Sequence, residues 1–310
     1  MADPAPLHSD IADGPDGGAA QWITTADARR LRVARWDPPG PSRGTVLIFQ
    51  GRTEYIEKYG VLAADLVAAG FTAVAIDWRG QGLSDRLLPD PLSGHVGRFA
   101  DYQLDVAALL THLAATDCPQ PLSLVAHSMG GAIGLRALIA GAPIRRAVFS
   151  APMWGILIAP RLRPAAWATA RAARWLGLTH RYAPGGSARA YASLIPFADN
   201  LLTTDPAQFA RMARQTEAVP ELALGGPSLG WLSEALMECR ALAALPSPDT
   251  PCLTLLGTDE AIVDPVAVRA RMARWPGGDL KVLDGARHEC LMEAPSLRSQ
   301  AMAALIGHLG

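Results

Sequence analysis

The stretch whose residue types best suit catalysis is AHSMG at residues 126–130, in which the small residues Ala126 and Gly130 lie two positions before and after Ser128. It is nearly G-x-S-x-G, with Ala126 in the place of the first glycine. A short apolar run precedes the serine and a helix-like pattern follows it, so the serine is expected at a sharp strand-to-helix bend. A simple helix-capping role for Ser128 is the alternative. The flanking pattern favours a nucleophile, with the backbone N–H of Met129 as one donor to an oxyanion.

A serine hydroxyl needs a general base, and the base needs a carboxylate to orient it. The sequence has seven histidines, and only His288, in LDGARHECL, follows a late predicted strand at its carboxyl end. Open α/β sheets place their functional sites at that edge, so we predict His288 as the base. Candidate acids follow another strand, in LLGTDEAIVDP: Asp259, Glu260 and Asp264.

These side chains must be held by a framework, and the hydrophobic pattern predicts one. Continuous apolar runs typical of buried parallel strands alternate with segments whose apolar residues recur every three or four positions. An opening hairpin is expected from residues 21–25 and 29–36. Later strands are expected within 44–51, 71–78, 121–128, 145–152, 251–257 and 280–285, and helices over 56–69, 99–115, 129–140, 265–275 and 295–309. The alternation predicts an α/β fold with a mostly parallel sheet and helices on both faces.

The alternation stops between residues 153 and 244, where the pattern is helical and loop-like. We therefore predict an α/β core made of residues 19–152 and 245–310, with a helical cap or lid inserted at 153–244. Residues 1–18 have neither an apolar stretch nor a basic start. They are expected to be a disordered leader and not a secretory signal.

Composition excludes several function classes. A formal net charge of −1 at pH 7 argues against a nucleic-acid partner. Four cysteines without metal-type spacing indicate reduced thiols and a cytoplasmic location, and no metal or organic cofactor is implied. No apolar run reaches the roughly 20 residues of a membrane-spanning helix. The composition does not predict an oligomeric state.

Five motifs together resemble the α/β-hydrolase superfamily, and within it the monoacylglycerol lipase and bacterial lysophospholipase branch: FQGRTEYIEKYG, AIDWRGQGLSDR, VAHSMGG, GTDEAIVDP and GARHE. The resemblance covers nearly all of residues 20–310 outside the insertion. It implies Glu260 as the triad acid, with Asp259 the runner-up, and the backbone amide of Arg52 as the second oxyanion donor. Gln50 replaces the histidine usual in the family, and a loop-bracing role is expected there.

The resemblance implies a serine hydrolase that cleaves carboxylic esters through an acyl-enzyme, acting on a small ester such as a lysophospholipid or monoacylglycerol. Trp154, Trp167 and Trp231 are candidate contacts for an acyl chain. Arginines around Trp167 could bring the lid to an anionic membrane surface: Arg161, Arg163, Arg171 and Arg174. A thioesterase remains open, as does an inactive binding protein of the same fold. So does an aminopeptidase, which would need acidic lid residues such as Glu217, Glu221 or Glu234.

Overall fold

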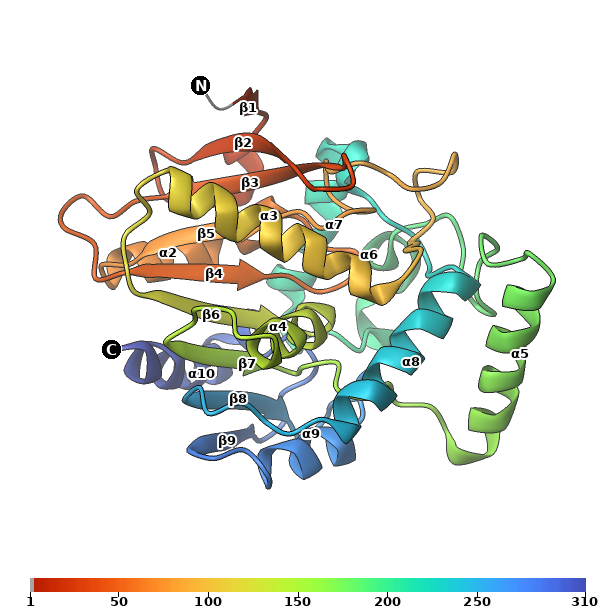
Figure 1. Ribbon diagram of the computed structural model, residues 1–310. Helices are drawn as coiled ribbons and strands as arrows, with labels where there is room; N and C mark the ends of the chain where they lie inside the picture. Colours follow the sequence, from red (N-terminus) through yellow and green to blue (C-terminus); the bar gives the residue numbers. More distant parts are fainter. Residues whose placement is uncertain (1–2) are drawn as a thin grey trace.

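A twisted nine-stranded sheet forms the centre of the molecule (Figure 1). The computed structural model describes residues 3–310. The strand order is β1-β2-β3-β5-β4-β6-β7-β8-β9. The six strands from β5 to β9 in this order run parallel, and β1, β2 and β3 pair antiparallel at one edge. The strands are β1 (Asp3–Ala5), β2 (Ala19–Thr24), β3 (Arg30–Trp36), β4 (Thr45–Phe49), β5 (Thr72–Ile76), β6 (Leu122–His127), β7 (Arg146–Ser150), β8 (Cys252–Gly257) and β9 (Gly278–Leu283). The mostly parallel α/β sheet predicted from the sequence is confirmed.

Helices cover both faces of the sheet, which explains why its central strands are apolar throughout. Every residue of β4 is buried, and successive side chains enter different cores: Val46 and Ile48 one, Leu47 and Phe49 the other. The core with Leu47 and Phe49 includes α3 (Tyr102–Ala115), α4 (Met129–Ile139), α8 (Leu229–Ala244) and α9 (Pro265–Met272). The core on the other face includes α2 (Gly60–Ala68) and α10 (Pro295–Leu309). No helix described within residues 3–310 has the length and apolar character needed to cross a bilayer.

The insertion leaves the core after β7 and lies beyond the carboxyl ends of the parallel strands (Figure 1). It carries α5 (Arg163–Trp175), α6 (Tyr191–Leu194) and α7 (Pro206–Ala218). The predicted insertion of residues 153–244 includes α8, but this helix belongs to the core layer, because Trp231, Ala235 and Leu242 join the same hydrophobic cluster as α4. The helix α8 therefore serves as the crossover from β7 to β8, and the lid is the segment that precedes it.

Residues 3–18 differ from the disordered leader that their composition suggested. They form β1, which pairs with β2, and the short helix α1 (Ser9–Ala12). The lid helix α7 holds this segment: Arg211 Nη2 donates to Ala12 O at 2.6 Å, and Gln215 Nε2 donates to Ile11 O at 2.7 Å. Order here comes from these tertiary contacts, which composition does not reveal. Residues 1 and 2 of the expected leader lie outside the described part of the chain.

Candidate active site

Ser128 occupies the bend between β6 and α4 with a strained backbone, at φ 49° and ψ −117°. Its side chain makes no capping hydrogen bond to the helix. The capping alternative therefore does not account for a serine at this position. A residue outside the favoured backbone regions costs free energy, and such residues persist where the surrounding structure enforces them.

The glycines after Ser128 allow the bend because backbone atoms crowd against them. A Cβ on Gly130 would lie 2.1 Å from the carbonyl oxygen of Phe49, and one on Gly131 would lie 2.5 Å from Cβ of Pro152. Ala126, which replaces the first glycine of the motif, is fully buried at the end of β6. The bend therefore requires glycine after the serine but accepts a methyl group before it.

His288 and Glu260 meet directly across two loops. His288 Nδ1 lies 2.8 Å from Glu260 Oε2, while Glu260 Oε1 accepts hydrogen bonds from Ile262 N at 2.6 Å and Val263 N at 3.1 Å. Because an ionised carboxylate only accepts, His288 Nδ1 carries the hydrogen and Nε2 is left to act as a base. Burial acts to raise the pKa of Glu260, but the hydrogen bond and charge of His288 and the two backbone amides outweigh it and hold that pKa below its ordinary value.

The other carboxylates of that loop lie elsewhere. Asp259 is exposed, and among the described residues 3–310 its carboxylate accepts only from the neighbouring Thr258 hydroxyl, at 3.3 Å. Asp264 caps α9 by accepting from Val266 N at 3.0 Å. Of the acids that the sequence left open, the structure brings Glu260 to His288.

Two backbone amides, those of Met129 and Arg52, are the predicted donors to an oxyanion, and both residues line the same cavity. Within residues 3–310, neither Arg52 N nor Met129 N donates a hydrogen bond. Two side-chain hydrogen bonds hold the loop that carries Arg52. Gln50 Nε2 donates to Asp77 Oδ1 at 3.0 Å, and Gln81 Nε2 donates to Gly51 O at 2.8 Å. Gln50 thus has the bracing contact expected for it.

Ser128 and His288 open into a cavity of about 380 Å³. Met129 and Arg52 also line it, and most of the remaining wall is apolar: Met153, Ile156, Leu201, Leu202, Met212, Leu224, Leu232, Ile262 and Val263. Only Trp231 of the three candidate tryptophans lines the cavity. Trp154 is buried behind α4, where its Nε1 donates to Gly131 O at 3.1 Å, and Trp167 lies on α5, 36% exposed. Neither of these two tryptophans lines the cavity, so an acyl-chain contact by either one stays a prediction.

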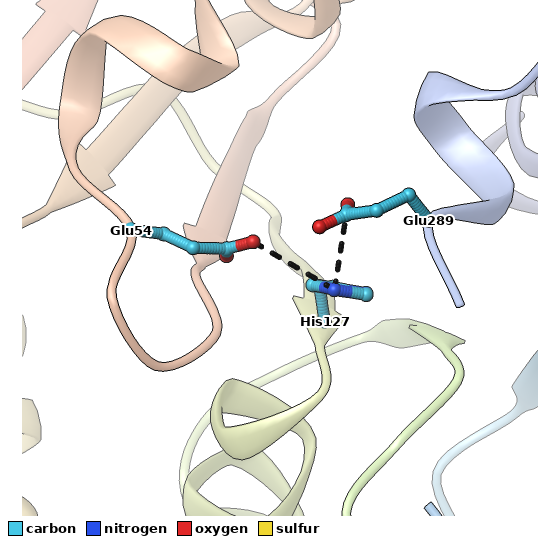
Figure 2. A group of neighbouring side chains, drawn as sticks. All are labelled: Glu54, His127 and Glu289. Carbon is cyan, nitrogen blue, oxygen red and sulfur yellow. Dashed lines mark ion pairs between the residues drawn. The ribbon is translucent and has the colours of Figure 1, made fainter. Parts of the chain in front are cut away.

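A buried charged cluster beside the site was missed by the sequence analysis. Figure 2 shows Glu54, His127 and Glu289, which come from three separate segments and converge on the His127 ring. His127 Nε2 lies 3.4 Å from Glu289 Oε2 and 3.7 Å from Glu54 Oε1, and Lys58 Nζ pairs with both carboxylates. The His127 ring centroid lies 4.7 Å from that of His288. The spacing of Glu54 and Lys58 four residues apart was the one signal available in the sequence.

Charge balance explains the pKa values in this cluster. Burial acts to lower the pKa of His127, but Glu289 and Glu54 outweigh it and raise that pKa above its ordinary value. Burial acts to raise the pKa of Glu289, but His127 and Lys58 hold it well below its ordinary value. The Lys58 ammonium, together with the imidazolium of His127 when it is protonated, balances the charge of the two carboxylates. Glu54, His127 and Glu289 offer ligand atoms within 4.8 Å of one another, as a metal would need, but the Lys58 ammonium already bridges the two carboxylates.

Comparison with known proteins shows the family to which the chain belongs. The family described as "Serine aminopeptidase, S33" matches residues 40–295. Lysophospholipase L2 of Escherichia coli strain K12 is 35% identical over 296 residues, which cover 92% of this chain and 85% of that protein. The probable lysophospholipase L2 of Haemophilus influenzae is 30% identical over 86% of this chain and 84% of its own. A monoglyceride lipase of Rattus norvegicus is 30% identical over 37% of this chain and 36% of its own length.

Solved structures share the fold. A soluble variant of monoglyceride lipase from Saccharomyces cerevisiae matches with a TM-score of 0.71 at 20% identity, covering 92% of each chain. A carboxyl esterase from Bacillus coagulans matches with a TM-score of 0.75 at 14% identity, covering 95% of this chain and 98% of its own. The chain therefore belongs to the serine aminopeptidase S33 family of α/β-hydrolases, in the branch that holds the lysophospholipases L2 and the monoglyceride lipases.

Proposed function

We propose that this protein is a serine hydrolase that cleaves fatty-acyl esters of glycerol, with lysophospholipids or monoacylglycerols as its substrate class. The observation that carries the proposal is the 2.8 Å hydrogen bond that Glu260 accepts from His288, which lines a largely apolar cavity together with Ser128. The names of the relatives, lysophospholipase L2 and monoglyceride lipase, support the ester class.

The mechanism follows from the roles that these groups can take. Ser128 Oγ attacks the ester carbonyl carbon while His288 Nε2 takes its proton, and Glu260 stabilises the imidazolium that forms. The amides of Arg52 and Met129 donate to the oxyanion. Collapse of the tetrahedral intermediate breaks the bond to the alcohol oxygen, which receives the proton from His288. A water molecule, deprotonated by His288, then hydrolyses the acyl-enzyme and releases the fatty acid.

The apolar wall of the cavity suits the acyl chain. Transfer of each methylene from water to such a wall contributes about 0.8 kcal/mol. Ile262 and Val263 belong to the core, and Leu201 and Met212 come from the lid, so both parts of the molecule would contact the chain. The lid is therefore expected to select acyl-chain length.

An aminopeptidase is less favoured. Such an enzyme needs a carboxylate for the substrate ammonium group, but Glu217 and Glu221 are exposed, and none of the lid acids considered lines the cavity. Glu54 and Glu289 do line it, but both already pair with the Lys58 ammonium. Glu234 Oε1 is paired with Arg174 at 2.8 Å, and its Oε2 accepts from Phe99 N. A thioesterase would use the same triad. Comparing the rates on an acyl-ester and an acyl-thioester distinguishes an esterase from a thioesterase.

The lid is also proposed to contact a lipid surface. Helix α5 presents Trp175 with 87% of its surface exposed, and Leu162 and Leu176 beside the helix are also exposed. Arg171 is exposed on the same helix. Exposed aromatic and aliphatic side chains next to arginines suit the headgroup region of an anionic membrane.

A cytoplasmic location is proposed on the state of the thiols. Cys118, Cys239, Cys252 and Cys290 are all free and buried. Unpaired cysteines are the common state in reducing compartments.

Labelling with a fluorophosphonate followed by a substrate panel tests the proposal. The wild-type protein should be labelled, Ser128→Ala should not be, and Ser193→Ala on the exposed lid should label normally. The panel holds monoacylglycerol, lysophosphatidylcholine, an acyl-thioester and an aminoacyl anilide. Hydrolysis of the first two should exceed that of the others, whereas preferred cleavage of the anilide would overturn the proposal.

A further inference from the structure

Arg52 has an unusual environment for a partly buried cation. Its side chain lines the cavity, and its Cζ lies 5.4 Å from the centroid of the Trp231 ring. Nη1 donates to the carbonyl oxygen of Gly225 at 3.0 Å, the only hydrogen bond that this guanidinium makes within residues 3–310. By contrast, the buried cations Arg32 and Lys58 each pair with two carboxylates.

The charge on Arg52 is therefore available to a ligand. Burial lowers the pKa of Arg52 to about 10, so the group remains cationic at neutral pH. A guanidinium has five N–H donors in a planar fork that matches the oxygens of a phosphate, and Gly225 uses one of them. A desolvated cation without an anionic partner gains more from such a ligand than an exposed one would.

Arg52 carries its guanidinium near the place where the ester carbonyl would bind. Its backbone N–H is a proposed donor to the oxyanion, so its guanidinium lies within one side-chain length of the ester carbonyl. In a 1-acyl lysophospholipid, as many bonds separate the ester carbonyl carbon from phosphorus as separate an arginine amide nitrogen from its guanidinium carbon. A substrate seated on the Arg52 amide can therefore bring its phosphate to the same residue's side chain.

We propose that Arg52 binds the phosphate of a lysophospholipid headgroup and so makes the site prefer phosphate-bearing substrates to neutral monoacylglycerols. This inference rests on the proposed ester hydrolysis at Ser128. The phosphate would lie between Trp231 on α8 and the Leu224–Pro227 side of the lid, since Arg52, Trp231, Leu224 and Pro227 line that part of the cavity together. The acyl chain would take the apolar remainder.

The test compares kcat/KM for lysophosphatidylcholine and for a monoacylglycerol of the same short acyl chain, both below their micelle-forming concentrations. In Arg52→Gln the ratio of the two values should fall about 10- to 100-fold, mainly through a higher KM for the lysophospholipid. Arg52→Lys should retain part of the preference, because it keeps the charge but loses the fork. Arg240→Gln, an exposed arginine on α8, should leave the ratio unchanged.

A second experiment compares glycerol 3-phosphate with inorganic phosphate as inhibitors of monoacylglycerol hydrolysis. The comparison distinguishes a site for a lipid headgroup from a site for free phosphate. Stronger inhibition of the wild type by glycerol 3-phosphate, weakened in Arg52→Gln, supports the headgroup. Equal inhibition by both anions with no preference for lysophospholipid overturns it. If Arg52→Gln leaves the ratio of the two kcat/KM values unchanged, or lowers kcat/KM equally for both esters, the inference about Arg52 is overturned but the proposed function is not. A wild type that cleaves neither ester would overturn the proposed function and this inference with it.

Discussion

At the scale of single residues, Ser128 is both the proposed nucleophile and a residue with a strained backbone conformation. Its backbone φ of 49° is one that residues other than glycine rarely adopt. Ser128→Ala should lower kcat by about 10⁴-fold or more and keep the strain. Ser128→Gly should be equally inactive but more stable than Ser128→Ala by about 1–2 kcal/mol in urea unfolding, because glycine accepts this conformation. Equal stability of the two variants would show that the bend stores no strain.

The choice of acid gives a second residue-scale prediction. Glu260→Gln removes the negative charge beside His288 Nδ1, and kcat for ester hydrolysis should fall by about 10²- to 10⁴-fold. Asp259→Asn, the matched control one residue away on the exposed loop, should change kcat less than about twofold. The reverse result would assign the acid to Asp259.

The sequence could predict those side chains whose roles depend on local pattern. Ser128 follows from its motif, and His288 follows from its place after a late strand. The Glu54–Lys58–Glu289–His127 cluster could not be predicted, because its members come from segments that only the folded chain brings together. The direction of the Arg52 guanidinium could not be predicted from the sequence either, because tertiary contacts orient the side chain of a loop residue.

At the scale of the secondary-structure elements, the junction of β6 and α4 depends on the absence of a side chain at Gly130. Gly130→Ala would bring a methyl group to 2.1 Å from the Phe49 carbonyl oxygen on β4. The free energy of unfolding should fall by at least about 3 kcal/mol, since neither backbone can move without displacing the sheet. Gly307→Ala in α10 is the control: apart from the adjacent backbone of α10 itself, no atom of the described residues lies within 4 Å of the added Cβ, and stability should rise by about 0.5–1 kcal/mol. Both values can be measured by urea unfolding, and a tolerated Gly130→Ala would contradict the proposed crowding.

The strands from β2 to β9 and the core helices were predictable because each carries an apolar run or an apolar period in the sequence, whereas β1 carries neither. The run TVLIF becomes β4, wholly buried, and residues 295–309 become α10 with the predicted bounds. The end of the lid was not predictable in the same way. Helix α8 has an apolar composition like that of its surroundings, and only its packing against α4 shows that it belongs to the core.

At the scale of the whole molecule, the charged cluster joins the loop after β4, the end of β6 and the segment after β9. Glu289 has a lowered pKa, so its stabilising effect is present above its ordinary value of 4.5 and is lost as the pH falls through the folded-state value. His127 has a raised pKa, so its effect is present below 6.5 and is lost as the pH rises through the folded-state value. The cluster should therefore stabilise the fold most between about pH 4.5 and 6.5.

Urea unfolding as a function of pH checks this window. The free energy of unfolding lost in Glu289→Gln should be about 3 kcal/mol inside the window and smaller on both sides of it. Glu217→Gln, at an exposed lid position, should show no such dependence. A loss that does not vary with pH would mean that the cluster does not titrate as described.

The exposed apolar surface of the lid also belongs to this scale. Trp175→Ser should weaken binding to anionic lipid vesicles roughly tenfold, because it removes an apolar side chain that lipid can cover. Hydrolysis of a monomeric p-nitrophenyl ester should not change. Val266→Ser is the control, since Val266 is 73% exposed on α9, outside the lid. Vesicle co-sedimentation measures the effect, and unchanged binding by Trp175→Ser would argue against α5 as the contact.

The hydrogen bonds from Arg211 and Gln215 to residues 11 and 12 have a practical consequence for anyone handling the protein. The helix that makes them, α7, also supplies Met212 to the cavity wall. An affinity tag or a truncation at the amino terminus should therefore alter the acyl-chain preference, although it lies far away in sequence from every reacting group. A tag fused after Gly310, at the end of α10, should not.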